Sequence, residues 1–297
     1  MTKCGRYGLS PADFDYSPST IRRSIQRSLE RLNTTYLDVI YLHDVEMVAE
    51  EVMPRREGDH SGALSEGREA YGLAIGQEGK VWGEGDRRVL EAYGELKKFK
   101  EEGLVKNIGI TGDLLGSIFT YCRQLNTVLG YPLPTLLRLA LLIRETHGPV
   151  DVMLSYCHLT IQNDTFLSFA KELTERAGVG QLLTASPLCM GLLTPNPPEW
   201  SPAPEKLKLA SSKLVDVCSA WSGGLPNIAL GFTYRTARRL GMPTVVGMGS
   251  LEQVHETMKV WREIVSDDGM QQRKEYEERV IQAFNDSGYR NYSWPSP

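Results

Sequence analysis

Hydrophobic and polar positions follow two different periods near the start of the chain. Apolar residues between positions 21 and 32 recur at helical spacing with arginines between them, directly after the Ser17-Pro18 pair. A serine followed by a proline is typical of a helix start. Residues 36–43 then form a nearly continuous apolar run rich in β-formers, as expected of a strand buried on both faces. The pattern predicts a helix followed by a buried strand.

The same unit recurs along the rest of the chain. Further helices are predicted over residues 89–100, 114–125, 135–146, 165–177, 228–240 and 251–264, and further strands over residues 105–111, 150–156, 181–185 and 243–247. Short apolar strands that each follow a helix predict a parallel sheet with right-handed crossovers. A closed (β/α) barrel and an open doubly wound sheet both fit this order. No G-x-G-x-x-G turn opens a helix, which favours the barrel.

Two segments interrupt this rhythm. Residues 44–86 hold many charged residues and glycines with few bulky apolar ones, and residues 193–204 contain five prolines. Both segments follow strand ends, and a parallel barrel builds its active site at the carboxyl ends of its strands. The sequence therefore predicts a single domain over residues 1–297 with two long loops on the side of the site.

Composition narrows the functional class. The chain is 41% hydrophobic and 24% charged, with a net charge of −4, so we expect no nucleic-acid partner. No apolar run approaches the roughly 20 residues of a membrane helix, so we expect no membrane partner. The first residues lack a secretory signal, and the five cysteines lie too far apart for a disulfide framework or a structural zinc site. These features predict a cytoplasmic protein without a metal site.

Polar residues at the predicted strand ends are the candidates for chemistry. His43 ends the first clear strand, and Lys3 stands near the start of the chain. The later strands end at Thr111-Gly112, Ser155-Tyr156, Ser186-Pro187 and residues 247–250. Small hydroxyl residues and glycines at such positions allow a ligand to approach the backbone, although they are equally common in turns.

Several segments together carry a resemblance to a known family. They are residues 2–8, 24–43, 105–112, 154–158, 185–193 and 247–256. With them the chain resembles the aldo-keto reductases, and most closely the branch that contains the D-arabinose and L-galactose dehydrogenases. The run from Ala185 to Leu193 is the most specific of these segments.

The resemblance implies a (β/α)8 barrel of the TIM type that binds NAD or NADP across the strand ends. It implies hydride transfer to or from a carbonyl carbon of a small-molecule sugar or related alcohol. Matched by motif, Lys3 would lower the pKa of a catalytic tyrosine, and His43 would orient the substrate oxygen. The positions that match cofactor-binding residues are Thr111, Ser155, Ser186, Leu188, Gly191, Gly247, Ser250, Gln253 and Glu256.

The chain also departs from the family pattern. Lys3 matches the end of the third family strand, so we expect an N-terminally incomplete barrel that lacks the family's catalytic aspartate and tyrosine. Tyr7 and Tyr16 follow the lysine and are not direct replacements. Gly249 stands where NADP-selective members carry a basic residue, which favours NAD.

Three functions follow from these observations. The first is an NAD(P)-dependent oxidoreductase of an aldose or a related alcohol or carbonyl, with an incomplete catalytic set. The second is a non-catalytic, cofactor-binding or scaffold remnant of the family. A barrel lyase or isomerase that uses Lys3 and His43 is the third and least supported.

Overall fold

A computed structural model describes residues 1–8, 10–112, 133–267 and 269–294. Its centre is a curled sheet of six parallel strands in the order of the sequence. The strands are β1 Thr2–Cys4, β2 Leu37–His43, β3 Val105–Gly112, β4 Val152–Tyr156, β5 Gln181–Ala185 and β6 Thr244–Val245. A doubly wound sheet reverses its strand order at a switch point, and this sheet does not. The predicted parallel sheet is thereby confirmed, with the barrel-like order.

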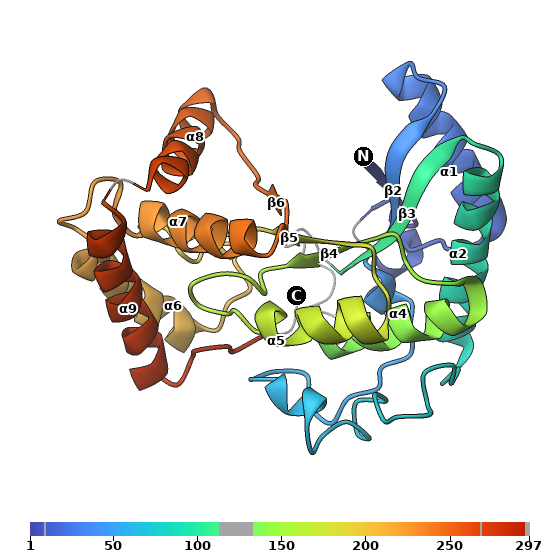
Figure 1. Ribbon diagram of the computed structural model, residues 1–297, viewed down its shortest axis with the longest axis horizontal. Coiled ribbons are helices and arrows are strands. Elements are labelled where there is room, and N and C mark those ends of the chain that lie inside the picture. The colour runs from blue at the N-terminus through green and yellow to red at the C-terminus, as the bar shows by residue number, and fades with distance from the viewer. Residues whose placement is uncertain (9, 113–132, 268, 295–297) are drawn as a thin grey trace.

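Helices follow the strands along the chain (Figure 1). They are α1 Pro18–Leu32, α2 Glu84–Glu101, α4 Leu133–His147, α5 Phe166–Lys171, α6 Glu205–Val217, α7 Gly224–Arg239, α8 Leu251–Ser266 and α9 Met270–Asp286. The helix predicted over residues 114–125 lies outside the described residues. The helix predicted over 165–177 is shorter than expected, because it changes into one π-helical turn, Glu172–Arg176.

Two helices, α6 and α9, have no counterpart in the sequence pattern. The faces of α9 that are buried hold Arg273, Glu277, Val280 and Phe284, so half of its inward positions are charged. An apolar period is weak in such a helix. The predicted long loop at 44–86 also contains two short 3₁₀ turns, Val45–Met47 and Ser61–Leu64, and its last residues already belong to α2.

The core divides into two main parts. The larger one joins the outer face of β1 to β5 with α1, α2, α4 and α5. The smaller one joins α6, α7 and α9 with the loop after β5. In Figure 1, α1 and α2 lie at one end of the molecule and α6, α7, α8 and α9 at the other, with α5 near the middle and α8 in contact with α7.

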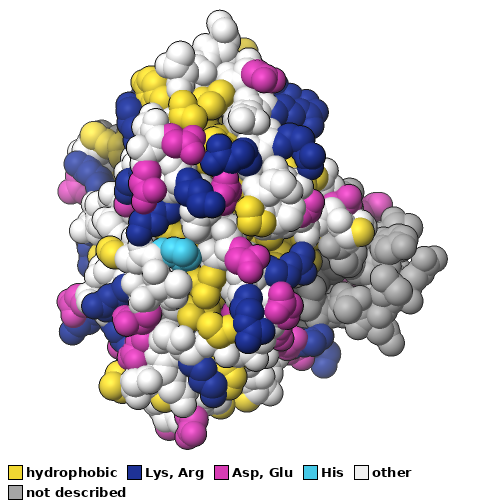
Figure 2. Space-filling view, turned by 90° about the vertical axis from the view of Figure 1, so that its right-hand side faces the viewer, with side chains coloured by type: hydrophobic (Ala, Val, Ile, Leu, Met, Phe, Trp, Pro, Cys, Tyr) yellow, Lys and Arg dark blue, Asp and Glu magenta, His cyan; other side chains and the backbone are white. Residues whose placement is uncertain are grey.

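The surface over the end that carries α1 and α2 is mixed in charge. Figure 2 shows lysine and arginine interspersed with aspartate and glutamate on this face. Among the helices that the structure describes, none has the length and apolar character needed to cross a bilayer.

Candidate functional site

Lys3 and His43 meet at the carboxyl end of the sheet. Parallel pairing of β1 with β2 places Lys3 opposite Tyr41, two residues before His43. Lys3 Nζ lies 3.2 Å from His43 Nε2, and the His43 side chain keeps 13% of its surface exposed. The structure thus brings together the two residues that the sequence singles out for catalysis.

Asp44 and Arg6 complete this cluster, and the sequence pattern alone did not identify them. Asp44 Oδ1 lies 3.4 Å from His43 Nε2, and Asp44 Oδ2 lies 2.7 Å from Arg6 Nη1. The Asp44 and Arg6 side chains are both buried. Neighbouring strand residues normally point to opposite faces. Asp44 reaches its own neighbour because it adopts a left-handed conformation, with φ 57° and ψ 56°.

Left-handed backbone at a non-glycine residue costs of order 1–3 kcal/mol and is concentrated at functional sites. The signal that could have indicated Asp44 was its place, a charged residue directly after a strand-ending histidine.

The two nearby tyrosines, Tyr16 and Tyr7, form hydrogen bonds with backbone atoms of the site. Tyr16 is buried, and its hydroxyl donates a 2.6 Å hydrogen bond to the carbonyl oxygen of His43. Burial raises the pKa of Tyr16 well above its ordinary value. The Tyr7 hydroxyl accepts a 3.1 Å hydrogen bond from the amide of Gly5, and partial burial raises the pKa of Tyr7 too. A side chain at Gly5 would place its Cβ 2.4 Å from the Tyr16 ring, so this close approach requires glycine.

Thr111 and Ser155 lie at the carboxyl ends of β3 and β4, with their side chains inside the protein. Both side chains are fully buried. Thr111 Oγ1 accepts a 3.5 Å hydrogen bond from the amide of Asp44, and Ser155 Oγ lies 3.0 Å from His158 Nδ1. Burial lowers the pKa of His158 to about 3, so its imidazole is neutral at pH 7. Neither Thr111 nor Ser155 belongs to the described lining of the cavity beside them.

That cavity holds most of the remaining cofactor candidates. Its volume is about 760 Å³, and it lies between the loop after β5 and the start of α8. Of the candidates, it is lined by Ser186, Leu188, Gly191, Gly247, Gln253 and Glu256. Tyr156 and Trp200 also line it, although neither matches a cofactor-binding position of the family. The volume falls in the range of ordinary ligand sites.

Ser250 has a different role from its neighbours. It caps the first turn of α8, with its Oγ accepting a 3.2 Å hydrogen bond from the amide of Gln253. The Gln253 side chain returns the contact, with Oε1 accepting a 2.6 Å hydrogen bond from the amide of Gly249. This reciprocal arrangement fixes the start of a sixteen-residue helix beside the cavity.

The loop after β5 is held in an uncommon conformation. Ser186, Cys189 and Met190 have φ values of 57°, 51° and 56°, followed by Gly191 at 81°. The Ser186 hydroxyl stabilises this left-handed path by accepting a 3.0 Å hydrogen bond from the amide of Met190. The resulting turn forms one wall of the cavity.

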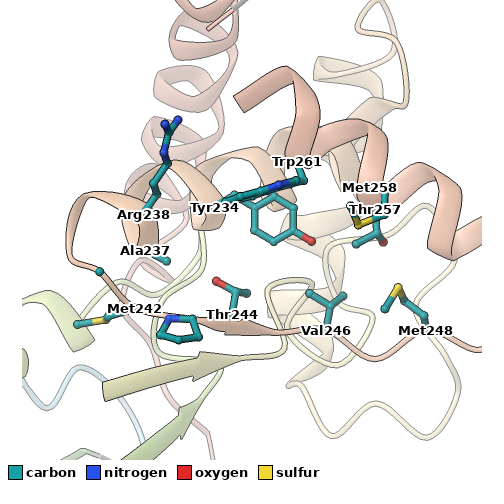
Figure 3. Close-up of a pocket in the computed structure, with 12 residues that line it drawn as sticks. Tyr234, Ala237, Arg238, Met242, Thr244, Val246, Met248, Thr257, Met258 and Trp261 are labelled. Atoms are coloured by element: carbon teal, nitrogen blue, oxygen red, sulfur yellow. The ribbon is translucent and has the colours of Figure 1, made fainter. Parts of the chain in front are cut away.

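A second cavity of about 540 Å³ lies between α7, α8 and β6. Figure 3 shows Trp261 and Tyr234 from the two helices above Thr244 and Val246. The two aromatic rings meet edge to face, with centroids 5.8 Å apart. Val246 and Thr257 line both cavities, so the second one adjoins the first.

The larger cavity combines the start of a helix with apolar walls. The described residues hold no group of histidine, cysteine and carboxylate side chains that could bind a metal ion. The start of α8 offers backbone amides, which suit a phosphate, and the apolar walls suit a flat ring.

Comparisons with known proteins agree with the fold. A sequence model of the Aldo/keto reductase family matches residues 1–278. An L-galactose dehydrogenase of Arabidopsis thaliana is 33% identical over 296 residues, which cover 99% of this chain and 72% of that protein. A D-arabinose 1-dehydrogenase of Saccharomyces cerevisiae is 29% identical over 273 residues, which cover 90% of this chain and 64% of that protein.

One solved structure supports the fold alone. A glycerol dehydrogenase from Gluconobacter oxydans superposes with a TM-score of 0.51 at 14% sequence identity. The matched region covers 94% of this chain and 70% of the other. The resemblance inferred from the sequence is therefore confirmed, and the chain spans about two thirds of the length of the relatives it matches.

Proposed function

Because this chain belongs to the aldo/keto reductase family, we propose that it functions as an NAD(P)-dependent oxidoreductase that acts on an aldose or a related alcohol or carbonyl. The two curated relatives are named for dehydrogenation of sugars, which supports this substrate class. The observation that carries the proposal is the 3.2 Å contact between Lys3 and His43. This contact lies at the carboxyl ends of the strands, the same end of the sheet that borders the larger cavity.

Strand register links the two parts of the site. His43 pairs with Thr111 across β2 and β3, and Gly112 pairs with Ser155 across β3 and β4. Ala185 then pairs with Tyr156 on one side and Val245 on the other. The carboxyl ends of successive strands thus lie side by side, from the strands that carry Lys3 and His43 to the strands that form the cavity wall.

The residues divide the work of such a reaction. A bound NAD(P) would supply or accept the hydride. The Lys3 ammonium favours negative charge on a substrate oxygen, and the His43 imidazole can orient that oxygen by a hydrogen bond. The cavity residues would hold the dinucleotide, with its phosphates near the first turn of α8. Gly249 brings no positive charge to that turn, which supports a preference for NAD.

We also propose that two further strand and helix units complete the barrel and carry the aspartate and tyrosine of the family. Within the described residues, β1 and β6 each pair on one side only. Unpaired edges of a sheet are ready to accept another strand. The proposal is that such units close the sheet between these two edges.

A non-catalytic, cofactor-binding protein is the second candidate function. The use of the Tyr16 hydroxyl in a bond to the His43 carbonyl favours it, because this phenol is then not free to exchange a proton with a substrate.

Turnover decides between the two functions. The purified chain is mixed with a panel of aldoses and NAD⁺ or NADP⁺, and reduced nucleotide is followed by its absorbance. The same assay is run on a version extended by two strand and helix units. Lys3→Met and His43→Asn test the pair, and Lys106→Met, an exposed lysine paired with Asp38 on the same sheet, is the matched control.

Weak or absent turnover by the 297-residue chain, with activity in the extended version that Lys3→Met and His43→Asn abolish, supports the oxidoreductase. Nucleotide binding without turnover in either version supports the second candidate. Turnover that survives both substitutions contradicts the assignment of the pair.

A further inference from the structure

The His43 imidazole presents a single nitrogen to two groups of opposite charge. Nε2 lies 3.2 Å from the Lys3 ammonium and 3.4 Å from the Asp44 carboxylate. The Asp44 side chain is 1% exposed, so its charge acts in a poorly solvated place.

These two contacts require different states of the same atom. An ammonium group only donates hydrogen bonds, so Lys3 needs a lone pair on Nε2. A carboxylate only accepts them, so Asp44 needs a hydrogen there. One ring nitrogen carries either a lone pair or a hydrogen, and the two neighbours therefore compete for its state.

The surrounding structure holds the Asp44 carboxylate close to His43. Its left-handed backbone turns the carboxylate back toward His43, and its carbonyl oxygen accepts a 3.0 Å hydrogen bond from the amide of Met47. Arg6 holds Oδ2 at 2.7 Å, which leaves Oδ1 toward the imidazole. The Arg6 guanidinium is itself fixed, since its Nε donates a 3.1 Å hydrogen bond to the Gly8 carbonyl and it lies 5.5 Å from the Phe14 ring.

We propose that Asp44, anchored by Arg6, is a positioning residue that competes with Lys3 for the proton state of His43 Nε2. The inference rests on the proposed function only for its consequence: Nε2 that carries a hydrogen can donate to a substrate oxygen, and Nε2 that faces the ammonium cannot. At 3.4 Å the carboxylate favours the proton by its charge but makes a longer contact than a good N–H···O bond.

Every charged group around His43 enters the prediction. Lys3 comes from β1 and Arg6 from the segment after it, and both disfavour a charged imidazole. Asp44 and Glu46 come from the segment after β2, and both favour it. From the other sides, the Tyr16 hydroxyl binds the His43 carbonyl, and Thr111 of β3 is uncharged.

The test is a pH titration of the His43 ring by ¹⁵N and ¹H NMR of the 297-residue protein, with the resonance assigned through His43→Asn. Buried His60 and His158 do not interfere near neutral pH, because burial lowers the pKa of these groups to about 4 and about 3. Burial also lowers the pKa of His147, and the exposed His255 is removed by His255→Asn.

Asp44→Asn is expected to lower the midpoint of the His43 titration by about one pH unit, and Lys3→Met to raise it by about one unit. Arg6→Gln is expected to raise it by less than Lys3→Met, because the guanidinium reaches His43 only through Asp44. Asp38→Asn removes an exposed carboxylate from the other end of β2 and leaves the midpoint unchanged.

An unchanged midpoint in Asp44→Asn, or shifts of the same sign in Asp44→Asn and Lys3→Met, would overturn the proposal. Asparagine adopts left-handed backbone readily, and the thermal unfolding midpoint checks that the variant remains folded. The titration needs neither nucleotide nor turnover. A protein that fails the sugar assay but shows these opposite shifts therefore contradicts the proposed function and leaves the competition intact.

Discussion

The two ends of the sheet are built on different principles. Around β1 to β4, buried charges are held by partners in the protein, as in the pairs Arg6 with Asp44 and Arg138 with Asp86. At the other end, β6 has only two residues, and the apolar side chains of Met248 and Trp261, which line the smaller cavity, are 44% and 39% exposed. The end that carries the candidate catalytic pair is preorganised, and the end that would hold the nucleotide is open.

The difference follows from what holds each end. Arg138 joins α4 to both ends of the long segment after β2, since Asp86 also accepts hydrogen bonds from the amides of Glu50 and Trp82. By contrast, α8 contacts mainly α7, and Glu263 of α8 forms a 2.7 Å ion pair with Arg273 of α9. Three of the sixteen α8 residues are buried, Thr257, Val260 and Ile264, and a helix with few buried contacts can change position at low cost.

The largest expected effect comes from breaking the buried pair at the preorganised end. Arg138→Met leaves the Asp86 carboxylate buried without its bidentate partner, whose two bonds are 2.7 and 2.9 Å long. We expect the free energy of unfolding to fall by about 3–5 kcal/mol. Urea denaturation measures it, with the exposed Arg87→Met as control, for which the loss stays below about 0.5 kcal/mol. Equal losses in the two variants would contradict the role of Arg138.

Acid is expected to weaken the preorganised end next. Burial lowers the pKa of His158 to about 3, below its ordinary value near 6.5. The folded state therefore favours the neutral ring, and this contribution is present above about pH 6.5 and is lost as the pH falls toward the folded pKa. Stability should decrease by at most about 1.4 kcal/mol per pH unit from this residue. His158→Gln is expected to flatten the decline of the thermal midpoint between pH 6.5 and 4.5, and an unchanged slope would contradict it.

At the preorganised end, the sequence predicted the strands better than it predicted the residues of the candidate site. Continuous apolar runs predicted β2 to β5 because parallel strands buried on both faces need such runs. His43 could be found from its place at the end of a predicted strand, and Lys3 only from its match to the family motif. Asp44 and Arg6 could not, because their contact depends on a left-handed residue and on tertiary approach. At the open end, β6 is shorter than predicted, since Val246 and Gly247 continue the run but have no strand partner there.

The third prediction concerns which dinucleotide binds more tightly at the open end. Gly249 lies at the start of α8 with open space beside it, where an added Cβ would meet only Gln253 Oε1 at 3.7 Å. We expect the native chain to bind NAD(H) at least as tightly as NADP(H). Gly249→Arg should tighten NADP(H) binding by about tenfold, or about 1.4 kcal/mol, because a guanidinium matches the 2′-phosphate.

Fluorescence titration at low ionic strength measures both dinucleotides, since surface cations act most strongly there. Lys259→Gln and Arg262→Gln are the controls on α8. If the native chain binds NADP(H) more tightly and loses this preference in either control, Gly249 is not the position that selects the nucleotide.

The smallest expected effect is the loss of an aromatic side chain at the open end. Trp261 is 39% exposed, and its main aromatic partner is Tyr234 across the smaller cavity. Trp261→Ala removes one edge-to-face contact beside space that already exists, so we expect a loss of only about 1 kcal/mol in the free energy of unfolding. Phe99→Ala is the matched truncation at the preorganised end. Phe99 lies on the buried face of α2 and is fully buried, and its loss should cost about 3–5 kcal/mol because a new cavity forms. Urea denaturation of the two variants tests the comparison directly. Equal losses would mean that α8 is packed as firmly as the first half of the sheet, and the open end would then be no easier to move than the catalytic pair.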